Sequence, residues 1–114
     1  MTVNIYDTAN ELERDLRQIK EYTELKDAHA AIRADEAANA ILTEFQGLQQ
    51  SIFMKQQMGQ EVSEEEIAEA QAASDKMMQN ELAVVLMEKE RALNQVIQDI
   101  NKIIMTPVQE IYAQ

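Results

Sequence analysis

The chain contains very few residues that interrupt a helix, and their positions divide it into segments. Its 114 residues include two glycines, Gly47 and Gly59, and one proline, Pro107. Gly59 and Pro107 both lie where a run of helically spaced apolar residues ends, whereas Gly47 lies inside such a run. Glycine readily adopts the left-handed conformation that closes a helix, and proline cannot donate the next helical hydrogen bond. The spacing therefore predicts a turn at Gly59 and a helix end at Pro107.

The segment after Gly59 carries the signals of a helix N-terminus. Ser63 can cap the unpaired N–H groups, and Glu66 three residues later can bond back to the cap. Val62 can pack on Ile67 as a hydrophobic staple. We therefore predict an all-α fold in which antiparallel helical hairpins form a bundle, with long helices and a turn near Gly59.

Composition is consistent with one helical domain over residues 1–114. Hydrophobic residues make up 46% of the chain and aromatic residues 4%, and there is no cysteine. This mixture, rich in Ala, Leu, Ile and Met, favours helix. No apolar run approaches the roughly 18 residues that a membrane span needs. Because the N-terminus lacks the pattern of a signal peptide, we expect a cytoplasmic protein that does not bind membranes.

The net charge of −11 is concentrated in the middle of the chain. Residues 35–81 hold ten acidic residues but only two basic ones, Lys55 and Lys76. Proteins grip nucleic acid by neutralising phosphates with Lys and Arg. We therefore expect no direct nucleic-acid partner.

Hydrophobic spacing predicts where the other helices begin and end. Asp7 is a candidate N-cap for a helix over 7–20, followed by a break near residues 21–23 with Thr23 as a second cap. Asp35 either caps a new helix or lies on the outer face of a continuing one. A joint is expected at residues 79–81, because an unbroken helix over 63–105 would be about 65 Å long. Gly47 either permits a close helix crossing or is a tolerated surface glycine.

The sequence lacks the combinations of residues that common catalytic and metal sites need. His29 is the only histidine, which disfavours di-iron carboxylate sites and histidine-based triads. Its place on an apolar stripe predicts a histidine at the edge of the core. Glu61, Glu64, Glu65, Glu66 and Glu69 are better explained by the helix macrodipole than by a cation. We expect no enzymatic activity, no cofactor and no metal.

Two further patterns concern partners. Six methionines beyond the first residue suit core filling, or alternatively an adaptable partner groove. A wide apolar stripe from Leu82 onward, together with the first helix, predicts a homodimer, since small helical domains often lack the core to cover such stripes alone. The interface candidates are Leu86, Leu93, Val96 and Ile97.

Short segments along the whole chain resemble the bacterial YlbF/YmcA family, in its YheA-like branch. They are residues 3–12, Glu21-Tyr22 followed by Leu25-Lys26, residues 35–37, Phe45 with Gln49, and residues 57–59, 103–107 and 110–113. The resemblance implies a small, helical, oligomerising cytoplasmic protein. It also implies a regulatory partner of the kind linked to competence, sporulation, biofilm formation and messenger-RNA processing. Some relatives carry cysteines that hold an iron–sulfur cluster, and that property does not transfer to a chain without cysteine.

Two functional hypotheses follow from these observations. The first is a non-catalytic, homo-oligomeric interaction or regulatory protein that serves as an accessory to RNA processing or developmental regulation. The alternative is a helical carrier that holds a small molecule or a metal ion inside the bundle.

Overall fold

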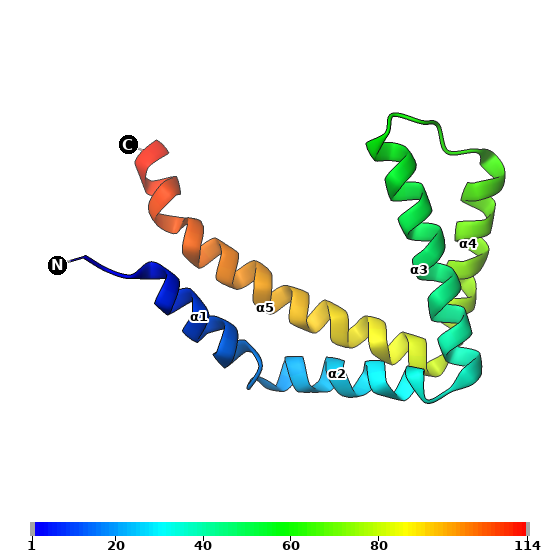
Figure 1. Cartoon of the computed structure of the whole chain (residues 1–114), viewed down its shortest axis with the longest axis horizontal. Helices are drawn as coiled ribbons and strands as arrows, with labels where there is room; N and C mark the ends of the chain where they lie inside the picture. Colours follow the sequence, from blue (N-terminus) through cyan, green and yellow to red (C-terminus); the bar gives the residue numbers. More distant parts are fainter. Residues whose placement is uncertain (1, 114) are drawn as a thin grey trace. The chain divides into compact units, whose positions relative to one another are not determined.

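The computed structural model describes residues 2–113, and helices make up nearly all of them (Figure 1). Within residues 2–113 there are five helices and no strand. The helices are α1 (Ile5–Leu16), α2 (Lys20–Arg33), α3 (Glu36–Gln57), α4 (Glu64–Gln79) and α5 (Glu81–Tyr112). Gly59 has a φ of 71°, the left-handed conformation expected at the end of α3. The predicted all-α fold and the turn near Gly59 are confirmed.

The chain comprises two compact units, and the boundary between them falls inside α2 and α5. The hairpin unit is Ala28–Met87. The terminal unit combines the described residues up to Asp27 with those from Glu88 onward. The expectation of a single domain over 1–114 concerns how these units behave together, and it stays a prediction.

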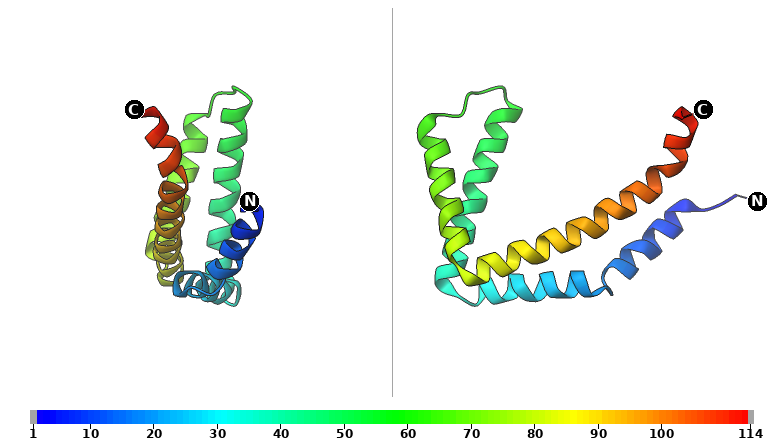
Figure 2. Two further views of the ribbon diagram at one scale, coloured as in Figure 1. Left: turned by 90° about the vertical axis from the view of Figure 1, so that its left-hand side faces the viewer. Right: turned by 180° about the vertical axis from the view of Figure 1, so that it is seen from behind.

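All of the fully buried residues that the structure describes lie in the hairpin unit. α3 and α4 run antiparallel and side by side in every view (Figures 1 and 2). Four of the eight buried residues are alanines, whose small side chains let helix backbones approach closely. The buried set is Ala28, Ile32, Ala38, Leu42, Ala73, Met77, Ala83 and Leu86.

Three side-chain caps define where the helices of the hairpin unit begin. Asp35 accepts a hydrogen bond from the Ala38 backbone N–H at 2.9 Å, so a new helix starts there. Ser63 caps α4 as predicted, accepting from the Glu66 N–H at 3.1 Å. Asn80 has extended backbone angles and accepts from the Ala83 N–H at 3.1 Å, which confirms the joint at residues 79–81.

Two ion pairs connect the arms of the hairpin. Lys55 on α3 pairs with Glu66 on α4, and Lys76 on α4 lies 3.5 Å from Glu44 on α3. The Glu66 carboxylate also accepts a hydrogen bond from the Ser63 hydroxyl at 3.1 Å. The hydrogen bond from Lys55, with a smaller contribution from Ser63, lowers the pKa of Glu66 below its usual value. Glu66 therefore connects the α4 cap to the opposite helix.

Two predictions about the first helix were wrong in position. Asn4, not Asp7, is the N-cap of α1, and its Oδ1 atom accepts from the Asp7 N–H at 3.3 Å. The chain breaks between Leu16 and Lys20 rather than at residues 21–23. Thr23 lies inside α2, where its hydroxyl donates to the Ile19 carbonyl at 3.4 Å. No glycine or proline marks this break, so hydrophobic spacing alone did not locate it.

The prediction that Pro107 ends the last helix was also wrong, because α5 continues through it to Tyr112. Proline removes the N–H that would bond the Ile103 carbonyl, and it bends a helix. Ile103 is 71% exposed, so water can hydrogen-bond to the freed carbonyl. The α5 ribbon curves toward its C-terminal end (Figure 1).

Glu66→Gln should reduce the melting temperature at pH 7 and have progressively less effect as the pH falls. The folded-state pKa of Glu66 is depressed, so the stability it contributes is present above the ordinary carboxyl pKa of about 4.5 and is lost as the pH falls through the folded value. Thermal melts between pH 7 and pH 3 measure this, with the exposed Glu65→Gln as control. An equal decrease in melting temperature for Glu66→Gln at pH 7 and at pH 3 would contradict this prediction.

Leu86→Ala should lower the free energy of unfolding by about 2–5 kcal/mol, because it opens a cavity in the core of the hairpin unit. Leu86 is 1% exposed, whereas its neighbour Val85 is 41% exposed. The matched variant Val85→Ala should cost no more than about 0.5 kcal/mol. Urea unfolding followed by circular dichroism measures the free energy of unfolding of both variants. Similar losses for the two variants would contradict the assignment of Leu86 to the core.

Candidate functional site

A single apolar stripe runs along α5, and its C-terminal part is exposed. From position 93 onward its residues recur at helical spacings of three and four, with Val96 and Ile97 adjacent in the sequence. Leu86 is buried, Leu93 and Ile100 are half-buried, and Ile104 and Ile111 are exposed. The later members of the stripe are Leu93, Val96, Ile97, Ile100, Ile104, Val108 and Ile111. The stripe therefore extends beyond the helices that cover it within one chain.

α1 also carries an apolar face that the rest of the single chain does not cover. Ile5, Ala9, Leu12 and Leu16 recur at helical spacing, and yet no residue of α1 is buried. Tyr6, beside this stripe, is 78% exposed. A helix with such a segregated apolar face normally buries it against a neighbour. In the single chain α1 lacks that cover.

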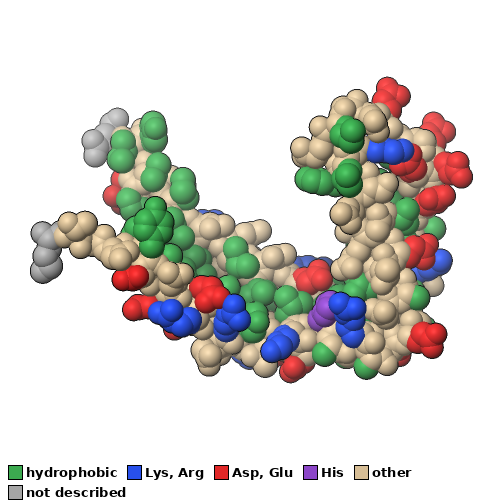
Figure 3. Space-filling model, in the orientation of Figure 1, with side chains coloured by type: hydrophobic (Ala, Val, Ile, Leu, Met, Phe, Trp, Pro, Cys, Tyr) green, Lys and Arg blue, Asp and Glu red, His purple; other side chains and the backbone are tan. Residues whose placement is uncertain are grey.

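An apolar groove joins α1 to the end of α5 within the terminal unit. Its volume is about 540 Å³, and it is lined by Ile5, Ala9 and Leu12 of α1 and by Ile104 of α5. Hydrophobic side chains gather over both segments in the space-filling view (Figure 3). We call the exposed apolar side chains of α1 and of α5 from Ile103 onward the terminal apolar surface. Monomeric soluble proteins rarely expose apolar patches larger than a few hundred Å².

Charge does not oppose contact between two copies of the C-terminal segment of α5. Residues 100–112 contain one basic side chain, Lys102, and one acidic side chain, Glu110. Nearer the hairpin unit, Lys89 replaces an apolar residue of the stripe and lies 3.0 Å from Glu24 of α2. This pair explains the charge that interrupts the α5 pattern, and it leaves the C-terminal part of the stripe apolar.

The four interface candidates from the sequence occupy different environments. Leu86 is buried within the hairpin unit, so it stabilises the single chain and is not on the surface. Leu93 and Val96 are half-buried, and Ile97 is 37% exposed. Leu93, Val96 and Ile97 stay candidate contacts. The more exposed residues Ile103, Ile104 and Ile111 were not among the predicted interface candidates, although their spacing continues the apolar pattern of α5.

The residues considered for chemistry are not brought together. His29 is exposed, so the prediction of a core-edge histidine was wrong. Glu64, Glu65 and Glu66 lie in the first turn of α4, where they complement the macrodipole. Among residues 2–113 no group of His, Cys, Asp or Glu side chains has the arrangement of a metal site. No helix in that range is both long enough and apolar enough to cross a bilayer.

A protein-family model described as "Control of competence regulator ComK, YlbF/YmcA" matches residues 5–109. The chain belongs to the YlbF/YmcA family. The UPF0342 protein of Pediococcus pentosaceus is 44% identical over 112 residues, covering 98% of each chain. The UPF0342 protein of Limosilactobacillus fermentum is 46% identical over 114 residues, covering 100% of this chain and 95% of the relative.

Several solved structures share this fold. The DUF964 protein of unknown function from Bacillus stearothermophilus superposes with a TM-score of 0.89 at 28% identity, covering 96% of each chain. YheA from Bacillus subtilis gives a TM-score of 0.76 at 34% identity, covering 96% of this chain and 100% of YheA. Bacillus subtilis RicA, solved in complex with RicF, gives 0.69 at 17% identity over 98% and 99% of the chains. At that identity, RicA supports the fold alone.

Proposed function

We propose that this member of the YlbF/YmcA family is a non-catalytic, cytoplasmic interaction protein that works as a homodimer. The observation that carries the proposal is the division of burial between the two units. Every fully buried residue that the structure describes lies in the hairpin unit, while the terminal unit exposes a long apolar stripe. Water contact with that stripe is unfavourable, so a partner that covers it stabilises the assembly.

A second copy of the chain is the partner that fits the terminal apolar surface best. A two-fold axis places the same patch on both sides of an interface, so an apolar patch is complementary to itself. Residues 100–112 have no net charge, so their approach to an identical segment meets little repulsion. Two copies would each contribute α1 and the end of α5, giving the four helices of a common bundle.

The cellular role that we propose is regulatory and depends on contact with another protein. The family description names control of a competence regulator, and RicA is a relative by fold that was solved with a protein partner. A dimer with an exposed helical surface can act as an accessory to developmental regulation or RNA processing without any reaction of its own. Affinity purification from the native cell, followed by mass spectrometry, would identify the protein that it contacts.

The alternative function is a carrier that holds a small molecule in the groove between α1 and Ile104. The groove volume of about 540 Å³ is in the range of small-molecule sites, which is the observation that favours this alternative. The two functions differ in a measurable property. A dimer has a melting temperature that rises with protein concentration, whereas a monomeric carrier is stabilised only by its ligand.

Ile104→Asp should convert the dimer to a monomer without unfolding the chain. Ile104 is 58% exposed in the single chain, so the monomer tolerates the change, but a dimer would bury an unpaired carboxylate. We expect the dimer Kd to rise at least about 100-fold, corresponding to about 3 kcal/mol. Sedimentation equilibrium measures this, with circular dichroism to confirm helicity.

The matched control is Gln98→Asp, which adds the same charge to an exposed position on the opposite side of α5. It should leave the dimer intact. Leu93→Asp, at a half-buried position of the stripe, should break self-association or folding. A chain that sediments as a monomer before any substitution, or an Ile104→Asp variant that stays as dimeric as Gln98→Asp, would overturn the proposed dimer.

A further inference from the structure

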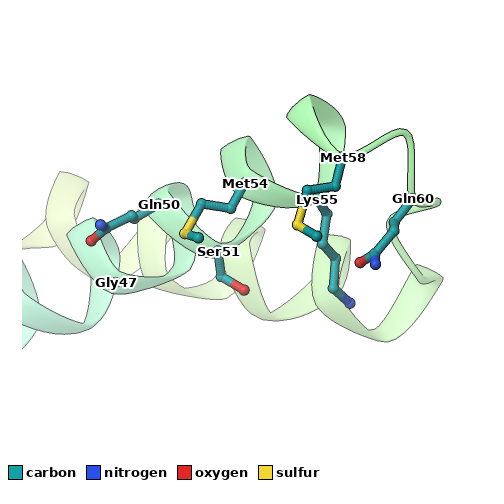
Figure 4. A pocket seen from close by; sticks show the side chains of 7 residues that line it. All are labelled: Gly47, Gln50, Ser51, Met54, Lys55, Met58 and Gln60. Carbon is teal, nitrogen blue, oxygen red and sulfur yellow. The ribbon is translucent and has the colours of Figure 1, made fainter.

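The tip of the hairpin unit carries a second exposed groove, separate from the terminal apolar surface. It lies along one face of α3 and has a volume of about 400 Å³. Met54 and Met58 extend over it from successive turns of the helix, with Gly47, Ser51 and Lys55 along the same stretch (Figure 4). The two methionines are 54% and 69% exposed. We call this feature the hairpin-tip groove.

Gly47 has no structural use within the described chain. A Cβ atom at Gly47 would meet no other atom within 4 Å, so the glycine does not permit a close helix crossing inside the unit. Glycine inside a helix costs about 1 kcal/mol relative to alanine. Its place at the end of the hairpin-tip groove leaves the α3 backbone open to an incoming chain.

The groove lining carries one charged side chain, Lys55, so the charge that selects a partner comes from the surrounding part of the hairpin unit. Residues 35–81 hold ten acidic and two basic side chains, a net charge of −8. Both basic residues are already paired within the unit, Lys55 with Glu66 and Lys76 with Glu44. Acidic side chains gather on the α4 side of the hairpin (Figure 3). The groove also lies at the C-terminal end of α3, where the helix dipole favours positive charge.

We infer that the hairpin-tip groove binds a basic amphipathic helix of another protein. Flexible, polarisable methionines adapt to varied apolar side chains, and a Met-lined groove on an acidic protein suits helices that combine apolar anchors with Lys or Arg. Leu, Ile or Met side chains of that helix contact Met54 and Met58. Its basic side chains face Glu61 of the loop and the acidic residues in the first turn of α4.

Charge excludes the competing occupants of the groove. A second copy of the chain would bring another hairpin with a net charge of −8 against the first, and this repulsion disfavours self-association there. Nucleic acid and anionic membrane surfaces are repelled for the same reason. The inference does not rest on the proposed dimer, because the hairpin-tip groove and the terminal apolar surface share no residue.

A model peptide tests the inference on the full-length protein. The probe is a helical peptide of about 18 residues built from Leu at helical spacing and Lys elsewhere, and the control peptide has Glu in place of Lys. Fluorescence anisotropy gives the Kd, and NMR of ¹³C-methyl-labelled methionines locates the contact. We expect the Lys peptide to bind, to shift the Met54 and Met58 methyl signals, and to weaken as salt rises.

Substitutions at methionines of similar exposure distinguish binding in the groove from general electrostatic attraction to the acidic protein. Replacing both groove methionines (Met54→Gln with Met58→Gln) should raise the Kd at least about tenfold. Gly47→Leu, which favours helix and fills the groove, should do the same. Met78→Gln should leave the Kd unchanged, because Met78 is 63% exposed on α4 but does not line the groove.

Four results would overturn the inference. One is equal binding of the Lys and Glu peptides, and another is a Kd that the double methionine variant leaves unchanged. A third is a shift of the Met78 signal in place of Met54 and Met58. The last is a change in the Met54 and Met58 signals with protein concentration alone, which would assign the groove to a second copy. Ile104→Asp should leave peptide binding unchanged. An experiment that contradicts the proposed dimer can therefore be distinguished from one that contradicts peptide binding in the hairpin-tip groove.

Discussion

The apolar stripe of α5 extends beyond the helices that cover it in the single chain. The behaviour that we propose for the molecule depends on this uncovered part of the stripe. At Leu86 the stripe is part of the hairpin core, where small alanines allow close helix packing. From Ile103 onward the stripe is exposed, and α1 offers an uncovered apolar face of its own. Burial of apolar surface is the main favourable contribution to folding and association. This distribution is the basis of our proposal that another molecule covers the exposed part of the stripe.

Charge assigns different partners to the two units. The terminal unit ends in a segment with no net charge, and such a segment meets its own copy without repulsion. The hairpin unit concentrates acidic residues, and both of its basic residues between positions 35 and 81 are paired internally. The self-association and the basic partner that we propose therefore use separate surfaces. Two such surfaces would allow one small protein to join two partners.

Local signals in the sequence predicted much of the fold. Ser63 and Gly59 act through short-range hydrogen bonds and backbone preferences, so the hairpin turn was predictable. The α4–α5 joint was predicted from the length that an unbroken helix would have. Failures occurred where local rules compete with context. Pro107 lies in an exposed part of α5, where the loss of one hydrogen bond does not end the helix, and the break after Leu16 contains no breaker residue. The sequence also could not predict that Ile104 and His29 are exposed. Helical spacing identifies an apolar face but not how far a neighbouring helix covers it.

The central claim is that a second copy covers the terminal apolar surface. Solvent paramagnetic relaxation of isoleucine methyl groups, with a soluble gadolinium chelate, tests it in the intact protein. Ile67 on α4 is 53% exposed and serves as the internal reference for Ile104 and Ile111, at 58% and 66%. The account predicts that the Ile104 and Ile111 methyls are protected from the chelate while the Ile67 methyl relaxes fully. Equal relaxation of all three at high protein concentration would contradict it.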